Sequence, residues 1–382
     1  MADADRRDDR IDRLRLIRSA NIGPVTYAHL IARFGTAGAA LDALPDLARR
    51  GGGRDVRIAP LAGIEREIAA VDRLGARYLF RGLASYPALL DEIESAPPAL
   101  ITWGDTALLD KPAVAVVGAR NASASACRYA RGLCRELAEA GVVVVSGLAR
   151  GIDTAAHLGA LDGGTIGVIA GGIDIFYPPE NEGLQREIAA RGLVIAEQPP
   201  GTEPRARHFP YRNRIIAGLA QATVVVEAAP KSGSLITARL ANEFGRDVLA
   251  VPGSPLDSRA QGCNLLIREG ATLIQTAADV LEALRPFGTL RQPRRAFAGA
   301  TLADLFADEG NPLSPAPPPP DALDLDDRGR GIVESLLGPS AVLIDEVIRL
   351  SELPAALVQM ALLELELGGR LERHAGGKVS LA

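Results

Sequence analysis

Short runs of apolar residues, each four or five residues long and rich in Val and Ile, recur along the chain between about residues 98 and 285. Stretches long enough for helices separate most of these runs. Strands that are apolar on both faces are buried in a parallel sheet that helices cover, so the pattern predicts a doubly wound α/β domain. The predicted strands are residues 99–102, 113–117, 142–145, 165–169, 193–196, 223–226 and 248–251.

The first 90 residues follow a helical period instead. Apolar residues begin a helix at Ile11, residues 21–24 (Asn-Ile-Gly-Pro) form a turn, and a second helix runs over 27–34 until Gly35 ends it. Helix, glycine-containing hairpin and helix is the helix-hairpin-helix pattern, which can hold a DNA backbone on the amides of its turn. Because the turn carries no basic residue, we favour a helical bundle that only packs over a DNA contact.

Proline-rich sequence follows the α/β pattern and includes four consecutive prolines at 317–320. Such a segment is expected to be extended rather than packed into a core. Beyond it, three helical runs precede two short predicted strands around Gly376 and Gly377, which is the pattern of a winged helix. The predicted domains are an N-terminal helical domain (helix-hairpin-helix or SAM-like) at 1–90, the α/β domain at 91–285, a linker at 286–325 and a winged helix at 326–382.

The third helical run of the winged helix, residues 354–368, is almost entirely apolar, and its only charges are Glu364 and Glu366. Residues 326–382 carry nine acidic and six basic residues, a net charge of −3. DNA phosphates repel an acidic helix, so we expect this helix to pack or to bind a protein rather than to read DNA. Truncation at about Leu323 is therefore expected to leave a soluble protein in which ligand binding by the α/β domain is nearly unchanged.

Composition narrows the class of protein. A chain of 382 residues is too long for one ordinary core, and 47% apolar with 23% charged residues is typical of a soluble globular protein. The charged N-terminus is not a secretory signal, and no run is long and apolar enough to span a bilayer. Three cysteines without metal-ligand spacing favour a reducing cytoplasm, and we expect neither a metal nor another cofactor. The net charge of −5 argues against a surface that is basic throughout, but it is compatible with a local basic groove.

Polar residues gather where the predicted strands end, and the carboxyl ends of parallel strands form the binding edge of such a sheet. One of these groups, Lys231 to Ser234 after the strand at 223–226, is a Gly/Ser turn that opens a helix, so backbone amides and the helix dipole favour an anion there. Lysine is rare in this chain, with three lysines among 42 basic residues. Its use at position 231 indicates a functional role for a compact ammonium group in place of a guanidinium. The candidate phosphate-binding residues are Gly118, Arg120, Ser146, Gly147, Arg150, Arg212, Asn213, Arg214, Lys231, Ser232, Gly233 and Ser234.

Several enzyme classes do not fit these strand ends. The first strand ends in GARNAS rather than GxGxxG, no GxxxxGK[ST] occurs, and the chain has no GxSxG, which argues against a dehydrogenase, a P-loop enzyme and a Ser-His-Asp hydrolase. Asp153 and His157 lie one helical turn apart, but no nucleophile stands beside them. We favour a hydrogen-bonded helix start for this pair, and we expect no catalytic residues.

Five ordered runs, VVGARNAS, SGLARGIDTAAH, FPYRNRIIAGL, EAAPKSGSLITARLANEFGRDVLAVPG and GCNLLIREGA, resemble the DNA-processing protein A family (DprA, also called Smf). The resemblance covers the whole α/β domain, and the flanking domains also look like that family. It implies an extended Rossmann-like fold, binding of single-stranded DNA and its delivery to the RecA recombinase in natural transformation. It also implies a homodimer without catalytic activity. By motif position, the family's phosphate-binding arginine falls on Arg120 and its pocket lysine on Lys231.

Three points stay open. Phe209 and Tyr211 could stack on bases, although we favour packing for these aromatic residues. The apolar residues 263–267 and 273–274 are expected at a dimer interface, and the alternative is that they belong to the core. The alternative function is a nucleoside-monophosphate phosphoribohydrolase of the lysine-decarboxylase-like (LOG) type, but KSGSLITARLANE lacks the double glycine of the PGGxGTxxE motif of those enzymes.

Overall fold

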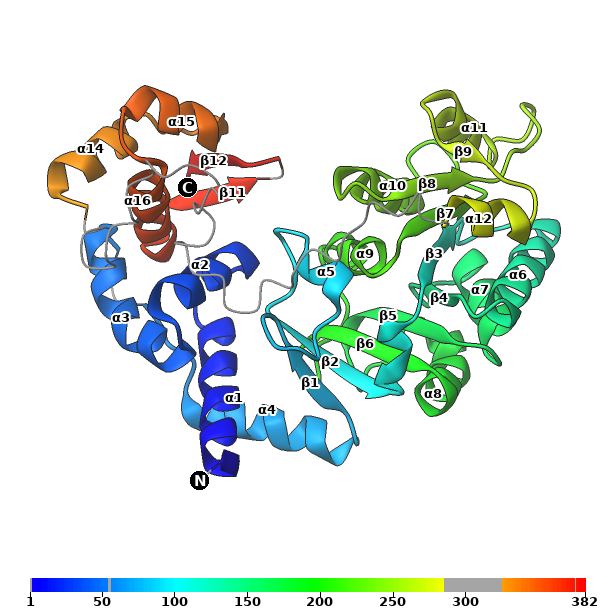
Figure 1. Cartoon of the computed structure of the whole chain (residues 1–382), viewed down its shortest axis with the longest axis horizontal. Coiled ribbons are helices and arrows are strands. Elements are labelled where there is room, and N and C mark those ends of the chain that lie inside the picture. Colours follow the sequence, from blue (N-terminus) through cyan, green and yellow to red (C-terminus); the bar gives the residue numbers. More distant parts are fainter. Residues whose placement is uncertain (1, 54–55, 285–324, 375) are drawn as a thin grey trace, which may run out of the picture. The chain divides into compact units, whose positions relative to one another are not determined.

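The computed structural model describes residues 2–53, 56–284, 325–374 and 376–382 (Figure 1). These residues form two compact units. One is the α/β unit, which begins at Glu67 and takes in the described residues up to 284. The other, here called the helical unit, joins the N-terminal residues up to Arg66 with the described residues from 325 to the end of the chain.

Nine strands of the described residues form the sheet of the α/β unit, in the order β1-β2-β6-β5-β4-β3-β7-β8-β9. From β6 to β9 the strands are parallel, whereas β2 runs antiparallel to both β6 and β1. The strands are β1 (Arg77–Phe80), β2 (Ala99–Gly104), β3 (Ala113–Gly118), β4 (Val143–Ser146), β5 (Thr165–Gly172), β6 (Leu193–Gln198), β7 (Ala222–Val226), β8 (Asp247–Ala250) and β9 (Thr272–Leu273).

All seven predicted strands are present, and the mostly parallel α/β sheet is confirmed. The strand predicted at 99–102 is not parallel to the others, however, and the sequence analysis missed two strands, β1 and β9. β1 lies inside the region predicted as the N-terminal domain. The contacts of the chain therefore place the boundary between Arg66 and Glu67, earlier than the predicted residue 90.

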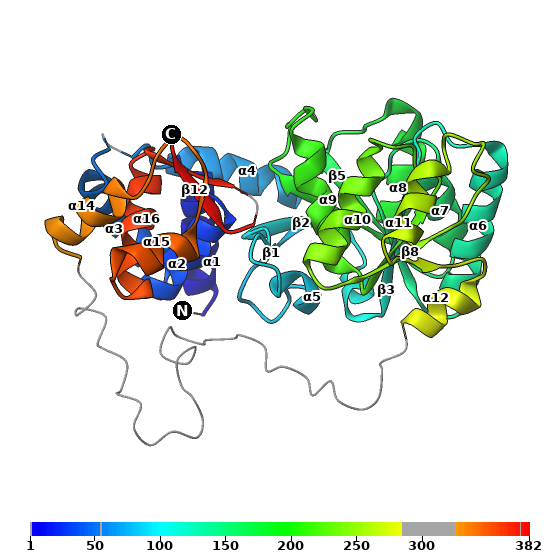
Figure 2. The same ribbon diagram turned by 90° about the horizontal axis from the view of Figure 1, so that it is seen from above.

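Side chains of the central strands point alternately to two apolar layers. Ala113, Ala115 and Val117 of β3 pack with α5, α9 and α11, whereas Val114 and Val116 pack with α6, α7 and α12. Figure 2 shows these helices from above. The helices of the unit after α4 are α5 (Ala88–Asp91), α6 (Ala124–Glu139), α7 (Ile152–Ala160), α8 (Glu182–Arg191), α9 (His208–Leu219), α10 (Gly233–Glu243), α11 (Gln261–Arg268) and α12 (Ala277–Ala283), with short 3-10 turns at Thr106–Asp110 and Pro179–Asn181.

The winding direction of the chain reverses at the centre of this sheet. From β3 the chain adds β4, β5 and β6 on one side, and it then returns to add β7, β8 and β9 on the other side. Strand ends on the carboxyl side of such a reversal leave room for a ligand. The polar groups that follow β3, β4, β5 and β7 are therefore brought to one edge of the sheet.

The helical unit contains the helix-hairpin-helix and winged-helix folds that the sequence predicts. Its helices α2 and α3 share one apolar core with the winged helix, in which Leu30 and Leu44 lie in the same cluster as Val358 and Leu362. Most of the predicted linker lies outside the described residues. The elements of the unit are α1 (Ala2–Arg18), α2 (Pro24–Phe34), α3 (Ala37–Arg50), the start of α4 (Leu61–Arg73), α14 (Asp327–Ser335), β10 (Val342–Leu343), α15 (Ile344–Ser351), α16 (Ala355–Leu367), β11 (Leu371–His374) and β12 (Lys378–Leu381).

Along the described ranges, no helix is both long and apolar enough to cross a membrane. Within the same ranges, His, Cys, Asp and Glu side chains nowhere gather in a group of three or more that could hold a metal ion.

Candidate nucleic-acid interface

A pocket of about 480 Å³ of empty space, part of it open to solvent, lies at the carboxyl ends of β3, β4 and β5 beside the start of α9. Three arginines and two aromatic residues contribute to its wall, together with glycine backbone at two strand ends. Cations, aromatic faces and exposed backbone are the groups that bind single-stranded nucleic acid. The lining of the pocket includes Arg120, Gly147, Arg150, Tyr177, Phe209 and Arg212.

Arg120 and the two aromatic side chains form one continuous wall of the pocket. The guanidinium carbon of Arg120 lies 5.0 Å from the centre of the Phe209 ring, which is cation–π distance. The centre of the Phe209 ring lies in turn 5.7 Å from that of Tyr177, and the two ring planes are tilted by 57°. Arg120 is exposed, so its charge is available to a phosphate while Phe209 orients its side chain.

Arg212 lies beneath the floor of the pocket, in the first turns of α9, and is almost fully buried. Burial lowers the pKa of its guanidinium to about 10, an effect that the nearby Asp153 opposes and the charge of Arg120 reinforces. Its Nε atom has no hydrogen-bond partner among the described residues. The charge of Arg212 is thus only partly compensated by the protein, which favours an anion in the pocket.

Asp153 balances this charge from below. Its Oδ2 accepts hydrogen bonds from the backbone amides of Gly147 (3.2 Å) and Ala149 (3.3 Å). Burial raises the pKa of the Asp153 carboxyl, while Arg212 and the two amides oppose that rise. A Cβ atom on Gly147 would overlap Nη1 of Arg212, so only glycine leaves space for the guanidinium at the end of β4.

Arg150 is the third cation of the pocket, and its side chain is 66% exposed. Its Nη1 lies 3.9 Å from Oε1 of Glu180, whose side chain is equally open to solvent. An ion pair so long and so exposed contributes little stability, and its arginine can exchange the carboxylate for a phosphate at small cost.

Two of the predicted phosphate-binding residues make close contacts within the sheet, and neither lines the pocket. A Cβ atom on Gly118 would overlap the backbone oxygen of Val226, so glycine is needed where β3 and β7 approach each other. The hydroxyl of Ser146 is buried and donates a 2.6 Å hydrogen bond to the backbone oxygen of Val116. Both residues lie at the ends of their strands and outside the pocket lining.

Asn213 and Arg214 likewise act within the fold and do not line the pocket. Arg214 is buried, with Nη2 2.5 Å from Oε1 of Glu197 and Nη1 donating to the backbone oxygen of Ser95. The side-chain amide of Asn213 donates to the backbone oxygen of Gly233 at 3.4 Å. Asn213 therefore ties α9 to the first residue of α10.

The turn from Lys231 to Ser234 opens α10 as predicted, but its residues lie outside the pocket lining. Lys231 is exposed and adopts a positive φ of 92°. The hydroxyl groups of Ser232 and Ser234 lie 2.8 Å apart, and Ser234 is buried. The structure thus separates the predicted site into a pocket around Arg120, Gly147, Arg150 and Arg212 and a second anion-favouring turn at Lys231.

The helix start at the switch point is occupied by a side chain of the protein itself. Glu227, directly after β7, accepts hydrogen bonds from the amide (2.8 Å) and the hydroxyl (2.6 Å) of Ser123, the residue that caps α6. A carboxylate at this place satisfies the positive end of the helix dipole. The amide and the hydroxyl of Ser123 are therefore already bonded within the protein.

Tyr177, which follows β5 and is 47% exposed, was not among the residues predicted from the sequence. Its position in the sequence, an aromatic residue soon after a predicted strand, could have identified it. The packing that we favoured for Tyr211 is wrong, because this side chain is 59% exposed. The structural interpretation of Asp153 and His157 is confirmed, since Asp153 caps the turn after β4 and Nδ1 of His157 lies 2.7 Å from the hydroxyl of Thr165.

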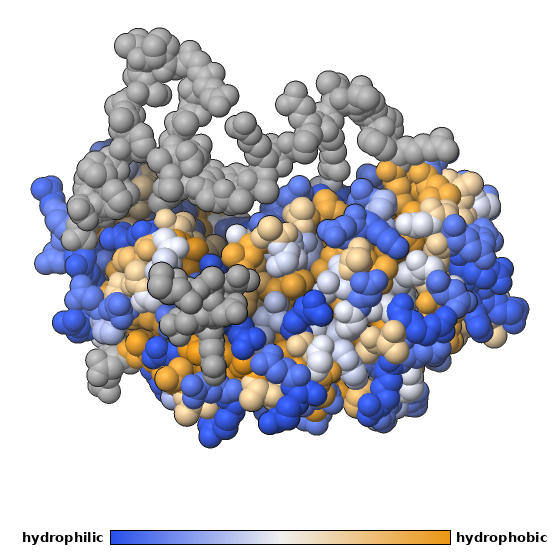
Figure 3. All heavy atoms as spheres, turned by 60° about the horizontal axis from the view of Figure 1, so that its bottom comes forward, coloured by the Kyte–Doolittle hydropathy of each residue, from blue (hydrophilic) through white to orange (hydrophobic). Residues whose placement is uncertain are grey.

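Hydrophilic and hydrophobic residues are interspersed over the face that Figure 3 shows.

Three family models match the chain. The model described as "DNA recombination-mediator protein A" matches residues 77–285, a "DprA-like N-terminal HHH domain" matches 7–70, and a "DprA winged helix domain" matches 314–377. The chain is similar to Protein Smf of Synechocystis sp., with 36% identity over 307 residues that cover 76% of each chain.

Two solved structures resemble this one. DNA processing protein A of Streptococcus pneumoniae superposes with a TM-score of 0.58 at 39% identity, over 71% of this chain and 95% of that one. DNA processing protein A of Helicobacter pylori, whose structure gives insights into its single-stranded DNA binding mode, superposes with a TM-score of 0.50 at 32% identity, over 55% of this chain and 95% of that one.

Proposed function

The chain belongs to the DNA recombination-mediator protein A family, and from this premise we propose that it binds single-stranded DNA, without sequence preference, in the pocket of the α/β unit. The observation that carries the proposal is the convergence of Arg120, Arg150 and Arg212 on one pocket walled by Phe209 and Tyr177. Arginines bind phosphates of any sequence, and an aromatic ring stacks on any base. A duplex hides its base faces, so the same pocket favours a single strand.

Fluorescence anisotropy with a labelled oligo-dT strand and a matched duplex, over a series of salt concentrations, tests this proposal. We expect tighter binding of the single strand. Arg120→Ala is expected to weaken the binding of all sequences alike and to reduce the salt slope by about 0.7, the value for one phosphate contact with a single strand.

Arg135→Ala is the matched control. It removes the same charge from the exposed surface of α6, where Arg135 lies 3.8 Å from Glu139 and does not line the pocket. If Arg120→Ala and Arg135→Ala bind the oligo-dT strand with the same affinity and the same salt slope, the pocket is not the DNA site.

We further propose that the bound strand is passed to RecA during natural transformation, in the cytoplasm. Support comes from the family alone, and the test is biochemical. The chain is expected to speed the onset of RecA ATPase activity on a strand that single-strand-binding protein already covers. An unchanged lag time at saturating protein would contradict this role.

A homodimer through the late part of the α/β unit is the proposed oligomeric state. Leu266 of α11 is partly buried against the sheet core, so replacing it would disturb folding as well as any interface. Leu256, in the loop before α11, is 95% exposed and has no role in the core. Leu256→Arg is therefore expected to yield a folded monomer by light scattering and circular dichroism, and an unchanged dimer mass would place the interface elsewhere.

We also propose that the chain acts by binding and does not catalyse a reaction. The alternative of a nucleoside-monophosphate hydrolase would use a glutamate after the Gly/Ser turn, and here Glu243 is exposed in the last turn of α10. Incubation of the purified protein with nucleoside monophosphates should release no free base, and steady release that is lost in Arg120→Ala would support the hydrolase.

A further inference from the structure

We propose that α16 of the winged helix is a docking helix whose partner is the N-terminal helices α2 and α3 of the same chain. The contact between α16 and these helices, here called the seam, persists when the covalent linker between them is cut. The seam lies wholly within the helical unit and joins segments about 300 residues apart in sequence. The inference concerns the role of the winged helix and is independent of the DNA pocket in the α/β unit.

The burial of α16 exceeds what the winged helix alone provides. A surface helix normally leaves a polar face in water, whereas α16 buries eight of its thirteen residues, including Met360 and Glu364. One side of the helix packs on α14 and α15, and another packs on α2 and α3. The second contact is part of a shared apolar core to which α2 contributes Leu30 and α3 contributes Leu44.

Glycines bring the two backbones into direct contact at one end of the seam. A Cβ atom on Gly51, just after α3, would overlap the backbone oxygen of Glu364 in α16. Conversely, a Cβ atom on Gly368 would lie 2.7 Å from the backbone oxygen of Gly51. Both residues have φ values, −74° and −70°, that any amino acid adopts, so the requirement for glycine comes from the contact and not from the backbone conformation.

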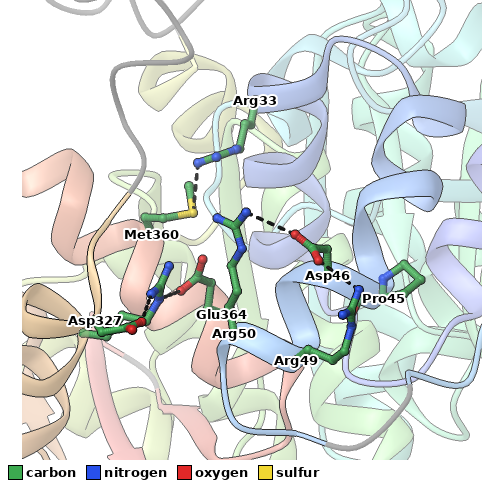
Figure 4. A network of polar contacts seen from close by, with 9 residues as sticks. Arg33, Pro45, Asp46, Arg49, Arg50, Asp327, Met360 and Glu364 are labelled. Atoms are coloured by element: carbon green, nitrogen blue, oxygen red, sulfur yellow. Dashed lines mark hydrogen bonds and ion pairs between the residues drawn. The ribbon is translucent and has the colours of Figure 1, made fainter.

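Polar contacts fix the position of α16 on the N-terminal helices. The side-chain amide of Asn21, in the helix-hairpin-helix turn, donates to the backbone oxygen of Leu367 at 3.3 Å. Arg33 of α2 donates to the sulfur of Met360 at 2.9 Å, as Figure 4 shows. The turn that could have held a DNA backbone is thus bonded to the end of α16.

The charges of α16 also argue against a nucleic-acid groove as its partner. The helix has no basic residue, and Glu364 is buried with its Oε2 2.6 Å from Nε of Arg330 in α14 (Figure 4). A helix that reads a groove presents cationic or amide side chains to an open surface. Here the corresponding surface is apolar and is covered by α2 and α3.

The test uses the full-length protein with a site-specific protease sequence inserted within residues 286–324. After complete cleavage, the C-terminal fragment is expected to co-elute with the rest of the chain on gel filtration at micromolar concentration. Separation of the two fragments at that concentration would overturn the proposal.

Gly51→Ala and Gly368→Ala each add a methyl group to the close contact between the end of α3 and the end of α16. Overpacking of this kind is expected to weaken retention of the cleaved fragment about tenfold or more in each variant. Gly63→Ala is the matched control, because a Cβ there lies at an ordinary 3.7 Å from Pro60, and it should retain the fragment like the wild type. Circular dichroism of the uncleaved proteins confirms that both variants fold, and full retention in both would contradict the seam.

Two further readouts separate this inference from the proposed function. Excess duplex or single-stranded DNA is expected not to release the cleaved fragment, and release by DNA would mean that α16 binds nucleic acid after all. Affinity of the cleaved protein for oligo-dT is expected to stay within about twofold of the uncleaved value. An error in the proposed DNA site would therefore appear in the binding measurement, and an error in the proposed seam would appear in the retention of the fragment.

Discussion

The α/β unit and the helical unit differ in how far apart in sequence their packing partners lie. In the α/β unit each parallel strand lies beside a strand that the chain reaches through a single crossover, apart from the one reversal between β3 and β7. In the helical unit the core joins α2 and α3 from one end of the chain to α16 from the other. Local periodicity predicted seven strands of the α/β unit, but it missed helix α3 of the helical unit. It predicts packing partners only where those partners are neighbours in sequence.

The largest expected effect is that of removing the winged helix. A chain that ends at Leu323 would uncover apolar side chains of α2 and α3, among them Leu30 and Leu44, which are fully buried in the intact structure. Each such side chain contributes about 1.5–3 kcal/mol through burial. We therefore expect aggregation or unfolding of the N-terminal helices, in place of the unchanged soluble protein that the sequence suggested.

The matched control removes both halves of the helical unit and keeps residues 61–284, including α4 as a whole. This fragment is expected to be soluble and to bind oligo-dT like the full chain. Analytical ultracentrifugation and hydrogen exchange compare the two truncations. A monodisperse protein truncated at Leu323, with α2 and α3 still protected from exchange, would show that the units differ less than the shared core implies.

Within the α/β unit, Gly147→Ala is expected to have the next largest effect. Its Cβ would overlap Nη1 of Arg212, so the buried guanidinium must shift away from Asp153. We expect a loss of about 1–3 kcal/mol in the free energy of unfolding and weaker binding of oligo-dT. Urea unfolding followed by the fluorescence of Trp103, the single tryptophan of the chain, reports on this unit alone.

Gly132→Ala in α6 serves as the control for that measurement, because a Cβ there meets no atom within 4 Å. It should leave stability unchanged or raise it by up to ~1 kcal/mol, as alanine does in an exposed helix. Equal stability of the two variants would show that Arg212 is not confined as described.

A pH effect of about 2 kcal/mol is expected from His157, which is fully buried in the α/β unit. Burial, with a contribution from Arg212, lowers the pKa of its imidazole to about 3. The unfolded chain binds a proton near pH 6.5 and the folded chain does not, so this stability is complete above pH 6.5 and is lost as pH falls toward 3. Between pH 7 and pH 5 the Trp103 transition should lose about 2 kcal/mol more in the wild type than in His157→Gln, and identical losses would contradict the assignment.

The smallest effect concerns Tyr211, which is exposed on α9 outside the pocket lining. If a strand leaves the pocket across α9, its bases can stack on this ring, and Tyr211→Ala should weaken oligo-dT binding by about 1 kcal/mol, or about fivefold. Tyr211→Phe keeps the ring and should restore the affinity. Equal binding by all three proteins would confine the DNA site to the pocket.

The strand ends show how far the sequence could predict the site. Position after a strand predicts the correct edge of the sheet, and Arg120 and Arg150 are found there. It does not say which way a side chain points, because neighbouring residues of a strand face opposite sides, and Ser146 points into the sheet. Likewise Arg212 and Arg214 are two residues apart on α9, so only one of them can face the pocket.

The shared core of the helical unit also has a consequence for synthesis of the protein. About 300 residues separate the end of α3 at Arg50 from the start of α16 at Ala355. A ribosome adds roughly 5–20 residues per second, so on the order of 15–60 s pass between the synthesis of α3 and that of α16, the helix that covers its apolar side. The first helices to leave the ribosome are therefore among the last to complete their packing, and throughout this interval they present to the cell a surface that other proteins or chaperones can bind.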